Sequence, residues 1–188
     1  MQYNLQIHDI IAYIMPALQM LWKLVCVYVL IVCINFVFVQ FIVHVFDTVI
    51  ANIICNYITM PGVIHHELSH AVAAFIFGAK IKKIRILPNK DSLGEVFIQP
   101  RGPKVLQALQ LSMSAIAPMV FGSATLYCMF AWMLPYILSV PGKIIFYYFA
   151  ISIFIHMTMS LTDIKRLLEG LIPTGLIVLI IVIIAVHA

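Results

Sequence analysis

Long runs without a single charged side chain dominate this sequence. Residues 24–46 contain no Asp, Glu, Lys or Arg, and neither do residues 105–142. A helix needs about 20 predominantly apolar residues to cross the hydrocarbon core of a bilayer. Only 10% of the 188 residues are charged and 64% are hydrophobic, whereas soluble domains are roughly 25% charged and 45–50% apolar. The chain is therefore predicted to be an integral, multi-pass membrane protein.

The apolar runs predict an all-α polytopic fold with about five transmembrane helices. The predicted spans are Leu24–Phe46, Thr48–Gly78, Val105–Leu134, Lys143–Thr162 and Leu171 to the C-terminus. Residues 1–22 are short, apolar and interrupted by Pro16, so they form either an interfacial helix or part of the first span. A chain of this length has no room for a separate soluble domain. Residues 1–188 are therefore predicted to be one membrane-embedded domain.

The basic residues gather in one loop. Seven of the eleven Lys and Arg residues lie between Lys80 and Lys104. A nucleic-acid partner is not needed to explain them, because short basic loops are typical of the cytoplasmic side of membrane proteins. Lys165 and Arg166, after the fourth predicted span, lie on the same side in this topology. The loop at residues 80–104 and the end of the fourth span are therefore predicted to face the cytoplasm.

This basic loop also changes secondary structure. The segments IKKIRIL and GEVFIQ are short and rich in β-branched residues. They are separated by PNKDS, a composition typical of turns. A short β-hairpin on the cytoplasmic side is therefore predicted within residues 80–104.

The densest polar stretch, PGVIHHELSHA, contains an HExxH motif at residues 66–70. Because residues four apart share one helix face, His66 and His70 can present ring nitrogens to one metal ion. Zinc in a catalytic site lowers the pKa of its bound water toward about 7, and Glu67 can accept the proton. The alternative is a hydrogen-bonded polar patch between helices. Glu67 is the only acidic residue between Asp47 and Asp91, and charges inside membranes are usually functional.

Two histidines do not complete a catalytic zinc site, which usually has three protein ligands. The candidates for the third ligand are Asp163, Glu169, His156, Asp91 and Glu95. Asp163 is favoured because it ends the fourth span on the side of the HExxH motif, although it can also serve as a helix cap.

The remaining candidates are interpreted more simply. Glu169 can pair with Lys165 four residues earlier, and His156 is interpreted as a bundle histidine deeper in the span. His65 falls outside the i, i+4 pair, so it is predicted to be a neighbour of the site. His44 and His187 are isolated in the sequence and are not predicted to be ligands.

Together these features resemble the site-2 protease family of intramembrane zinc metalloproteases. The string HELSHAVAAFIFGAKIKKI is especially similar, and the resemblance covers roughly Thr59–Leu171. It implies Zn²⁺ held by His66, His70 and Asp163, with Glu67 as the catalytic base. It also implies cleavage of peptide bonds in or beside a membrane-spanning substrate. Substrate binding is then expected at four hairpin residues, where an extended peptide can add to a sheet edge: Ile84, Ile86, Val96 and Ile98.

The sequence also departs from the family pattern. The usual third-ligand motif has Gly after Asp, whereas Ile164 follows Asp163 here. The Gly-Pro-x-x-Asn pattern of the central span appears only as residues 117–121, with Phe121 in place of the asparagine. The chain has no space for a PDZ-like insertion. These departures indicate a divergent, minimal branch.

Two other functions are compatible with the composition. The first is a non-catalytic zinc-binding membrane chaperone or adaptor of the same fold, although a pure binder does not need Glu67. The second is a small transporter, which would be expected to carry polar groups on several spans and internal symmetry. The first and fifth predicted spans are nearly free of such groups. A transmembrane protein or peptide substrate in a lipid bilayer is therefore the predicted partner.

Overall fold

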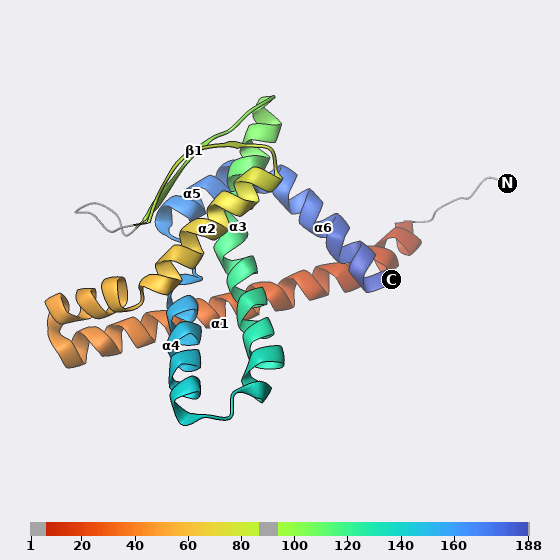
Figure 1. Cartoon of the computed structure of the whole chain (residues 1–188). Helices are drawn as coiled ribbons and strands as arrows, with labels where there is room; N and C mark the ends of the chain where they lie inside the picture. Colours follow the sequence, from red (N-terminus) through yellow and green to blue (C-terminus); the bar gives the residue numbers. More distant parts are fainter. Residues whose placement is uncertain (1–6, 87–93, 188) are drawn as a thin grey trace.

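A computed structural model describes residues 7–86 and 94–187, which are mostly helical with one small sheet (Figure 1). The helices are α1 (Ile7–Ile53), α2 (Met60–Ile76), α3 (Lys104–Cys128), α4 (Val140–His156), α5 (Leu161–Glu169) and α6 (Leu171–His187). The strands β1 (Lys80–Arg85) and β2 (Glu95–Gln99) pair with each other. The all-α prediction with one short hairpin is therefore confirmed in outline.

Two helices in the described chain are long and apolar enough to cross a membrane, which is fewer than the five predicted. They are Ile14–Asp47, within α1, and Lys104–Tyr136, which continues α3 through short π and 3₁₀ turns. The pair α4 and α5 makes a third if it is counted as one span bent by 55°. The first of these helices includes Pro16, so part of residues 1–22 belongs to the first apolar helix.

The second predicted span is interrupted for local reasons, and the fifth forms a shorter helix than the two long ones. Asp47 has a positive φ of 67° and its carboxylate accepts a hydrogen bond from Val49 N, so the chain turns there. A π-helical turn and Pro61 at the start of α2 interrupt the following apolar run. This leaves α2 with 17 residues, and α6 also has 17. Both are shorter than the two long apolar helices and lie at the low end of the range of about 17–25 residues typical of a transmembrane helix.

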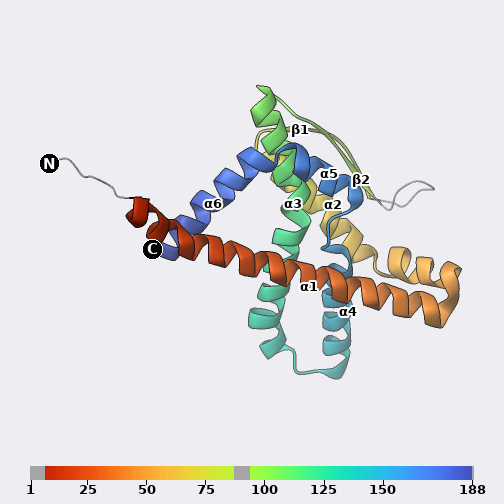
Figure 2. The ribbon, with the colours of Figure 1, turned by 180° about the vertical axis from the view of Figure 1, so that it is seen from behind.

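The motif helix, α2, is buried along one face and exposed along another. α3 and α4 stand side by side, and α2 packs against both of them and against the two strands (Figure 1). α5 packs on α3, and α6 runs back from α5 to contact α1. Seen from behind, α1 crosses α3 and α4 (Figure 2). The interior of this arrangement is where α2 carries the HExxH motif.

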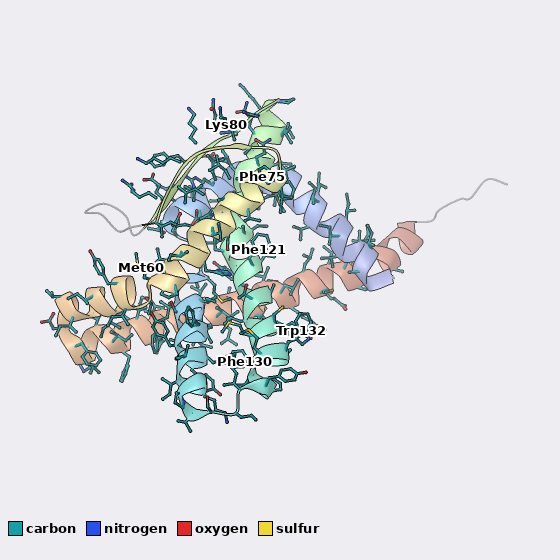
Figure 3. The ribbon with its side chains drawn as sticks, viewed as in Figure 1. Met60, Phe75, Lys80, Phe121, Phe130 and Trp132 are labelled. Carbon is teal, nitrogen blue, oxygen red and sulfur yellow. The ribbon has the colours of Figure 1, made fainter. Side chains whose placement is uncertain are left out.

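The hairpin is antiparallel as predicted. Ile84 pairs with Val96 and Arg85 with Glu95, and the register shifts near the other end, between Ile81 and Lys83. Residues 87–93, which contain the predicted turn, lie outside the described residues. In Figure 3, Met60 and Phe75 mark the two ends of α2, and Lys80 lies just beyond Phe75 at the start of the hairpin. The hairpin therefore returns over the helix that carries the motif.

Polar side chains on α4 hold the start of α2 in place. The Ser152 hydroxyl donates to Thr59 O (2.8 Å) and accepts from Gly62 N (2.7 Å), while Tyr148 OH donates to Ile58 O (2.7 Å). A Cβ atom at position 62 would overlap the Ser152 carbonyl oxygen, so Gly62 permits the close approach. Backbone groups in an apolar medium must find partners within the protein. These contacts supply them where the helix is interrupted.

Candidate metal centre

One turn of α2 brings the two motif histidines together. His66 and His70 lie on the same helix face, with ring centroids 4.6 Å apart and planes at 82°. Their Nε2 atoms are only 3.0 Å apart. His70 is buried and His66 is partly buried. The spacing expected from the HExxH motif is therefore realised in the fold.

Backbone carbonyls fix the tautomer of each histidine. His66 Nδ1 lies within hydrogen-bond distance of the carbonyl oxygen of His156, and His70 Nδ1 of that of Ser114 (2.7 Å). A carbonyl can only accept, so each Nδ1 must carry the proton. In a neutral imidazole the Nε2 atom then presents a lone pair. Two lone pairs facing each other at 3.0 Å need a cation or a proton between them.

Asp163 reaches the same point from α5. Ser160 caps this helix: its hydroxyl accepts from Asp163 N, while its own N–H and hydroxyl donate to Asp163 Oδ2 (3.0 and 2.6 Å). The carboxylate lies close to both histidines, with Oδ1 3.4 Å from His70 Nε2 and Oδ2 3.7 Å from His66 Nε2. Asp163 is 3% exposed. The aspartate therefore belongs to a helix cap and also joins the histidine pair.

The three side chains have a spacing that suits a metal ion. One ligand atom from each residue, His66, His70 and Asp163, lies within 4.8 Å of the others. Zinc binds nitrogen and oxygen at about 2.0–2.2 Å in tetrahedral sites, which places neighbouring ligand atoms about 3.3 Å apart. The two Nε2 atoms are 3.0 Å apart, Oδ1 lies 3.4 Å from His70 Nε2, and the other carboxylate oxygen, Oδ2, lies 3.7 Å from His66 Nε2. These separations are all close to that value. The group can therefore hold a metal ion.

A cavity of about 700 Å³ opens beside this group. Its lining includes Glu67, which is buried, and Gly94, whose missing side chain leaves room for it. A Cβ atom at position 94 would lie 2.6 Å from Glu67 Cγ. The hairpin therefore covers Glu67 closely at Gly94, and both residues line the cavity.

Two arginines line the cavity in different surroundings. Arg85 of β1 forms an ion pair with Glu95 of β2, directly opposite in the register. Arg166 lies three residues after Asp163 on α5, with Nη1 3.9 Å from Asp163 Oδ1. This distance exceeds that of a hydrogen bond, so the attraction is electrostatic. Arg166 thus places a positive charge next to the candidate metal ligand.

The other candidate ligands have separate positions. His65 Nε2 lies 3.0 Å from the Thr125 hydroxyl and does not line the cavity, in keeping with its predicted place as a neighbour. Glu95 pairs with Arg85, and Glu169 is exposed at the end of α5. His156 lines the cavity, where its ring lies 2.8 Å from Thr59 Oγ1 and its carbonyl orients His66. His44 is exposed on α1 and is not part of the His66–His70–Asp163 group. Asp91 and the side chain of His187 lie outside the described part of the chain.

The four predicted substrate-binding residues differ in burial and in whether they line the cavity. Val96 is buried and lines the cavity. Ile84 and Ile86 are exposed, and Ile98 is partly buried away from the cavity lining. Substrate binding by these residues stays a prediction.

Sequence reasoning missed three contributors to the site. Ser114 orients His70 through its carbonyl, and its hydroxyl donates to the His70 carbonyl oxygen (2.9 Å). Its polarity within an apolar run is a signal that could identify it. In the sequence, Arg166 indicates only which side of the membrane its segment faces, and Gly94 is only the first residue of a predicted strand. Their roles depend on contacts between distant segments that no local pattern encodes.

No family model, characterised protein or solved structure matches this chain. The chemical character of the site comes from its own residues. It combines a buried and a partly buried histidine, an aspartate brought in from another helix, and a glutamate in the same cavity.

Proposed function

We propose that this protein is a zinc-dependent endopeptidase that hydrolyses peptide bonds in or next to membrane-spanning segments of other proteins. The observation that carries the proposal is the position of Asp163, whose carboxylate lies 3.4 Å from the Nε2 atom of His70. It adds an oxygen ligand to the two nitrogens of an HExxH motif, a residue set typical of catalytic zinc. The resemblance of residues 59–171 to the site-2 protease family supports the same reaction.

Zinc is the ion that this donor set favours. Two imidazole nitrogens and one carboxylate match catalytic zinc sites, which keep a further position open. Each histidine is oriented by a backbone carbonyl on its other nitrogen, as is usual for metal-binding histidines. A shared proton could also lie between the two Nε2 atoms. The carboxylate spacing and the adjoining cavity favour a metal ion over that arrangement.

The reaction then divides among residues of the cavity. Zinc, when bound, supplies Lewis acidity that polarises a carbonyl group and lowers the pKa of water. Glu67 takes the proton from the attacking water and returns it to the leaving amine. The carbonyl oxygen of the substrate becomes negatively charged as water attacks the carbonyl carbon. Arg166 lies where it can stabilise this charge, because its guanidinium group lines the same cavity beside Asp163.

The shape of the cavity suggests how a substrate is bound. Val96 and the Arg85–Glu95 pair line the cavity from the hairpin, and Met159 and Thr162 line it from the α4–α5 connection and from α5. A helical substrate must unwind locally before its carbonyls can react, because they are hydrogen-bonded within the helix. An unwound segment can pair with a strand edge through its main chain. We therefore propose a partly unwound peptide near the membrane surface as the substrate.

The orientation of the protein in the membrane follows from the distribution of its charged residues. The basic hairpin and the site lie together, since Arg85, Glu95 and Val96 line the cavity that contains His66 and Asp163. By the distribution of basic residues, we assign this side to the cytoplasm. The apolar helices α1 and α3 and the bent pair α4–α5 are assigned to the bilayer.

Removal and return of the metal test the proposed activity. The purified full chain in detergent is incubated with a single-span reporter before and after treatment with a chelator, and again after Zn²⁺ is restored. Cleavage should disappear with the metal and return with zinc. A reporter that stays intact at full zinc occupancy, across a panel of unrelated spans, would favour the non-catalytic adaptor. Cleavage that is insensitive to complete metal removal would contradict a zinc enzyme.

A further inference from the structure

Helix α1 carries a buried polar side chain that lipid packing does not explain. Most of its large apolar residues are exposed, as expected for a helix that faces lipid. Asn35, in the middle of this apolar run, is only 7% exposed. Tyr28, seven residues earlier on the same face, is partly buried. Polar residues inside membranes are rare and mostly functional.

Both side chains contact the break between α4 and α5. The Asn35 amide donates to the carbonyl oxygens of Phe154 (3.0 Å) and Ile155 (2.8 Å). The Tyr28 hydroxyl accepts from Met159 N at 3.4 Å. The polar face of α1 therefore contacts both sides of the residue that ends α4, His156.

The Phe154 and Ile155 carbonyls are backbone groups that a helix end leaves without intrahelical donors. The last four carbonyls of a helix have no intrahelical N–H donor. In an apolar medium such groups need partners from elsewhere in the protein. At the end of α4, Asn35 supplies partners for two of them, and His66 Nδ1 binds the third, that of His156. A residue of the lipid-facing helix and a residue of the metal centre thus cap the same helix end.

This capped end determines where the third ligand lies. From His156 the chain passes through four residues, turns by 55°, and enters α5 at the Ser160–Asp163 cap. We propose that Asn35 is a positioning residue. It holds the end of α4 so that the His156 carbonyl orients His66 while the bend directs Asp163 toward it. The positioning role of Asn35 rests on the contacts described above, and only the presence of a metal ion at the site rests on the proposed function.

Metal affinity tests this role with zinc and cobalt alone. The Asn35→Leu variant keeps the side-chain size but removes both donors, and Gln40→Leu makes the same type of change at an exposed position on the same helix. Asn35→Leu should weaken Zn²⁺ binding by about 10–100-fold, as is typical for residues that support metal ligands. It should also change the visible spectrum of the Co²⁺-loaded protein. Gln40→Leu should leave both unchanged.

A milder variant covers the case in which Asn35→Leu does not fold. Tyr28→Phe removes one hydroxyl and should weaken Zn²⁺ binding to a smaller extent, with helical content unchanged by circular dichroism. If Asn35→Leu does not fold, Asn35→Asp takes its place. Wild-type zinc affinity and an unaltered Co²⁺ spectrum in both Tyr28→Phe and the folded Asn35 variant would overturn the proposal. The inference and the proposed activity can fail separately. If the wild type binds zinc without cleaving any reporter, and Asn35→Leu binds zinc more weakly, the positioning role of Asn35 is supported and the proposed activity is not.

Discussion

Hydrogen bonds to single atoms prepare the metal centre. The Nδ1 atoms of His66 and His70 are both engaged by carbonyl oxygens, which leaves their Nε2 atoms facing each other. Asp163 Oδ2 is engaged by Ser160, whereas Oδ1 approaches His70. Each of the three residues therefore has one atom that orients it and another that is available to a metal ion.

The two roles of Asp163 can be separated by substitution. Asp163→Asn keeps an oxygen that can accept from Ser160, but it removes the charge that attracts a cation. We expect α5 to persist and Zn²⁺ affinity to fall by at least about tenfold, measured by competition with a chromophoric chelator. Ser160→Ala is the complementary variant, because it removes the cap and leaves the carboxylate. It should lower thermal stability by about 1 kcal/mol and weaken zinc binding less. Equal zinc affinity in Asp163→Asn and wild type would exclude Asp163 as a ligand.

Arg166 is expected to act on the reaction and not on the metal. Arg166→Gln should lower kcat by about 100–1,000-fold, the usual effect of losing one group that stabilises developing negative charge. Its zinc content should match that of the wild type. Lys165→Gln is the matched control, because Lys165 is exposed on the same short helix and does not line the cavity. Equal losses of kcat in the two variants would point to a general effect of charge on α5.

The elements around the site are held by close backbone approaches that depend on glycine. Gly62 lets α2 approach α4, and Gly94 lets the hairpin approach Glu67. The HExxH helix and the hairpin could be predicted from sequence because both have local signals, spacing in one case and turn composition in the other. The positions at which the long apolar runs break into separate helices could not be predicted. Asp47 ends a helix through a positive φ, and α4 ends at His156 where side chains from α1 and α2 cap it.

Substitution of Gly62 tests the approach of α2 to α4. Gly62→Ala places a methyl group against the Ser152 carbonyl and should lower stability by about 1–3 kcal/mol, the usual range for overpacking. Thermal unfolding in detergent measures the change. Gly175→Ala is the control, because nothing lies within 4 Å of its Cβ position in α6. That variant should be neutral or more stable by up to about 1 kcal/mol. A Gly62→Ala protein as stable as Gly175→Ala would contradict this close packing of α2 on α4.

The whole molecule places a polar site inside an apolar assembly. Composition alone predicts a membrane protein, because charge-free runs of this length match the thickness of the hydrocarbon core. Sequence overestimates the number of spans, because hydropathy does not distinguish a spanning helix from a short apolar helix that packs on its neighbours through one face. α2 is such a helix: Gly62, Val63, Ala71 and Ala74 are buried, whereas Phe75 and Ile76 are exposed. Asp163 could be predicted from its position after an apolar run, although its distance from His70 could come only from the fold.

The sidedness of the assembly can be measured by thiol labelling. In a background without native cysteines, Lys82→Cys in the hairpin should react with a membrane-impermeant reagent only from the cytoplasmic side. Ser139→Cys, in the connection between α3 and α4 at the opposite end, should react only from the other side. This pattern follows from the clustering of basic residues near the hairpin. Labelling of Lys82→Cys from outside intact cells would reverse the assigned orientation.

The replacement of Glu67 by Gln is the most direct test that the protein is a zinc endopeptidase. Glutamine keeps the size of the buried side chain but cannot accept the proton that peptide hydrolysis requires. Zinc content and reporter cleavage are measured on the same purified sample, beside the wild type. The result expected is a variant that binds zinc as the wild type does and does not cleave the reporter. Cleavage by Glu67→Gln at the wild-type rate would contradict the proposed mechanism.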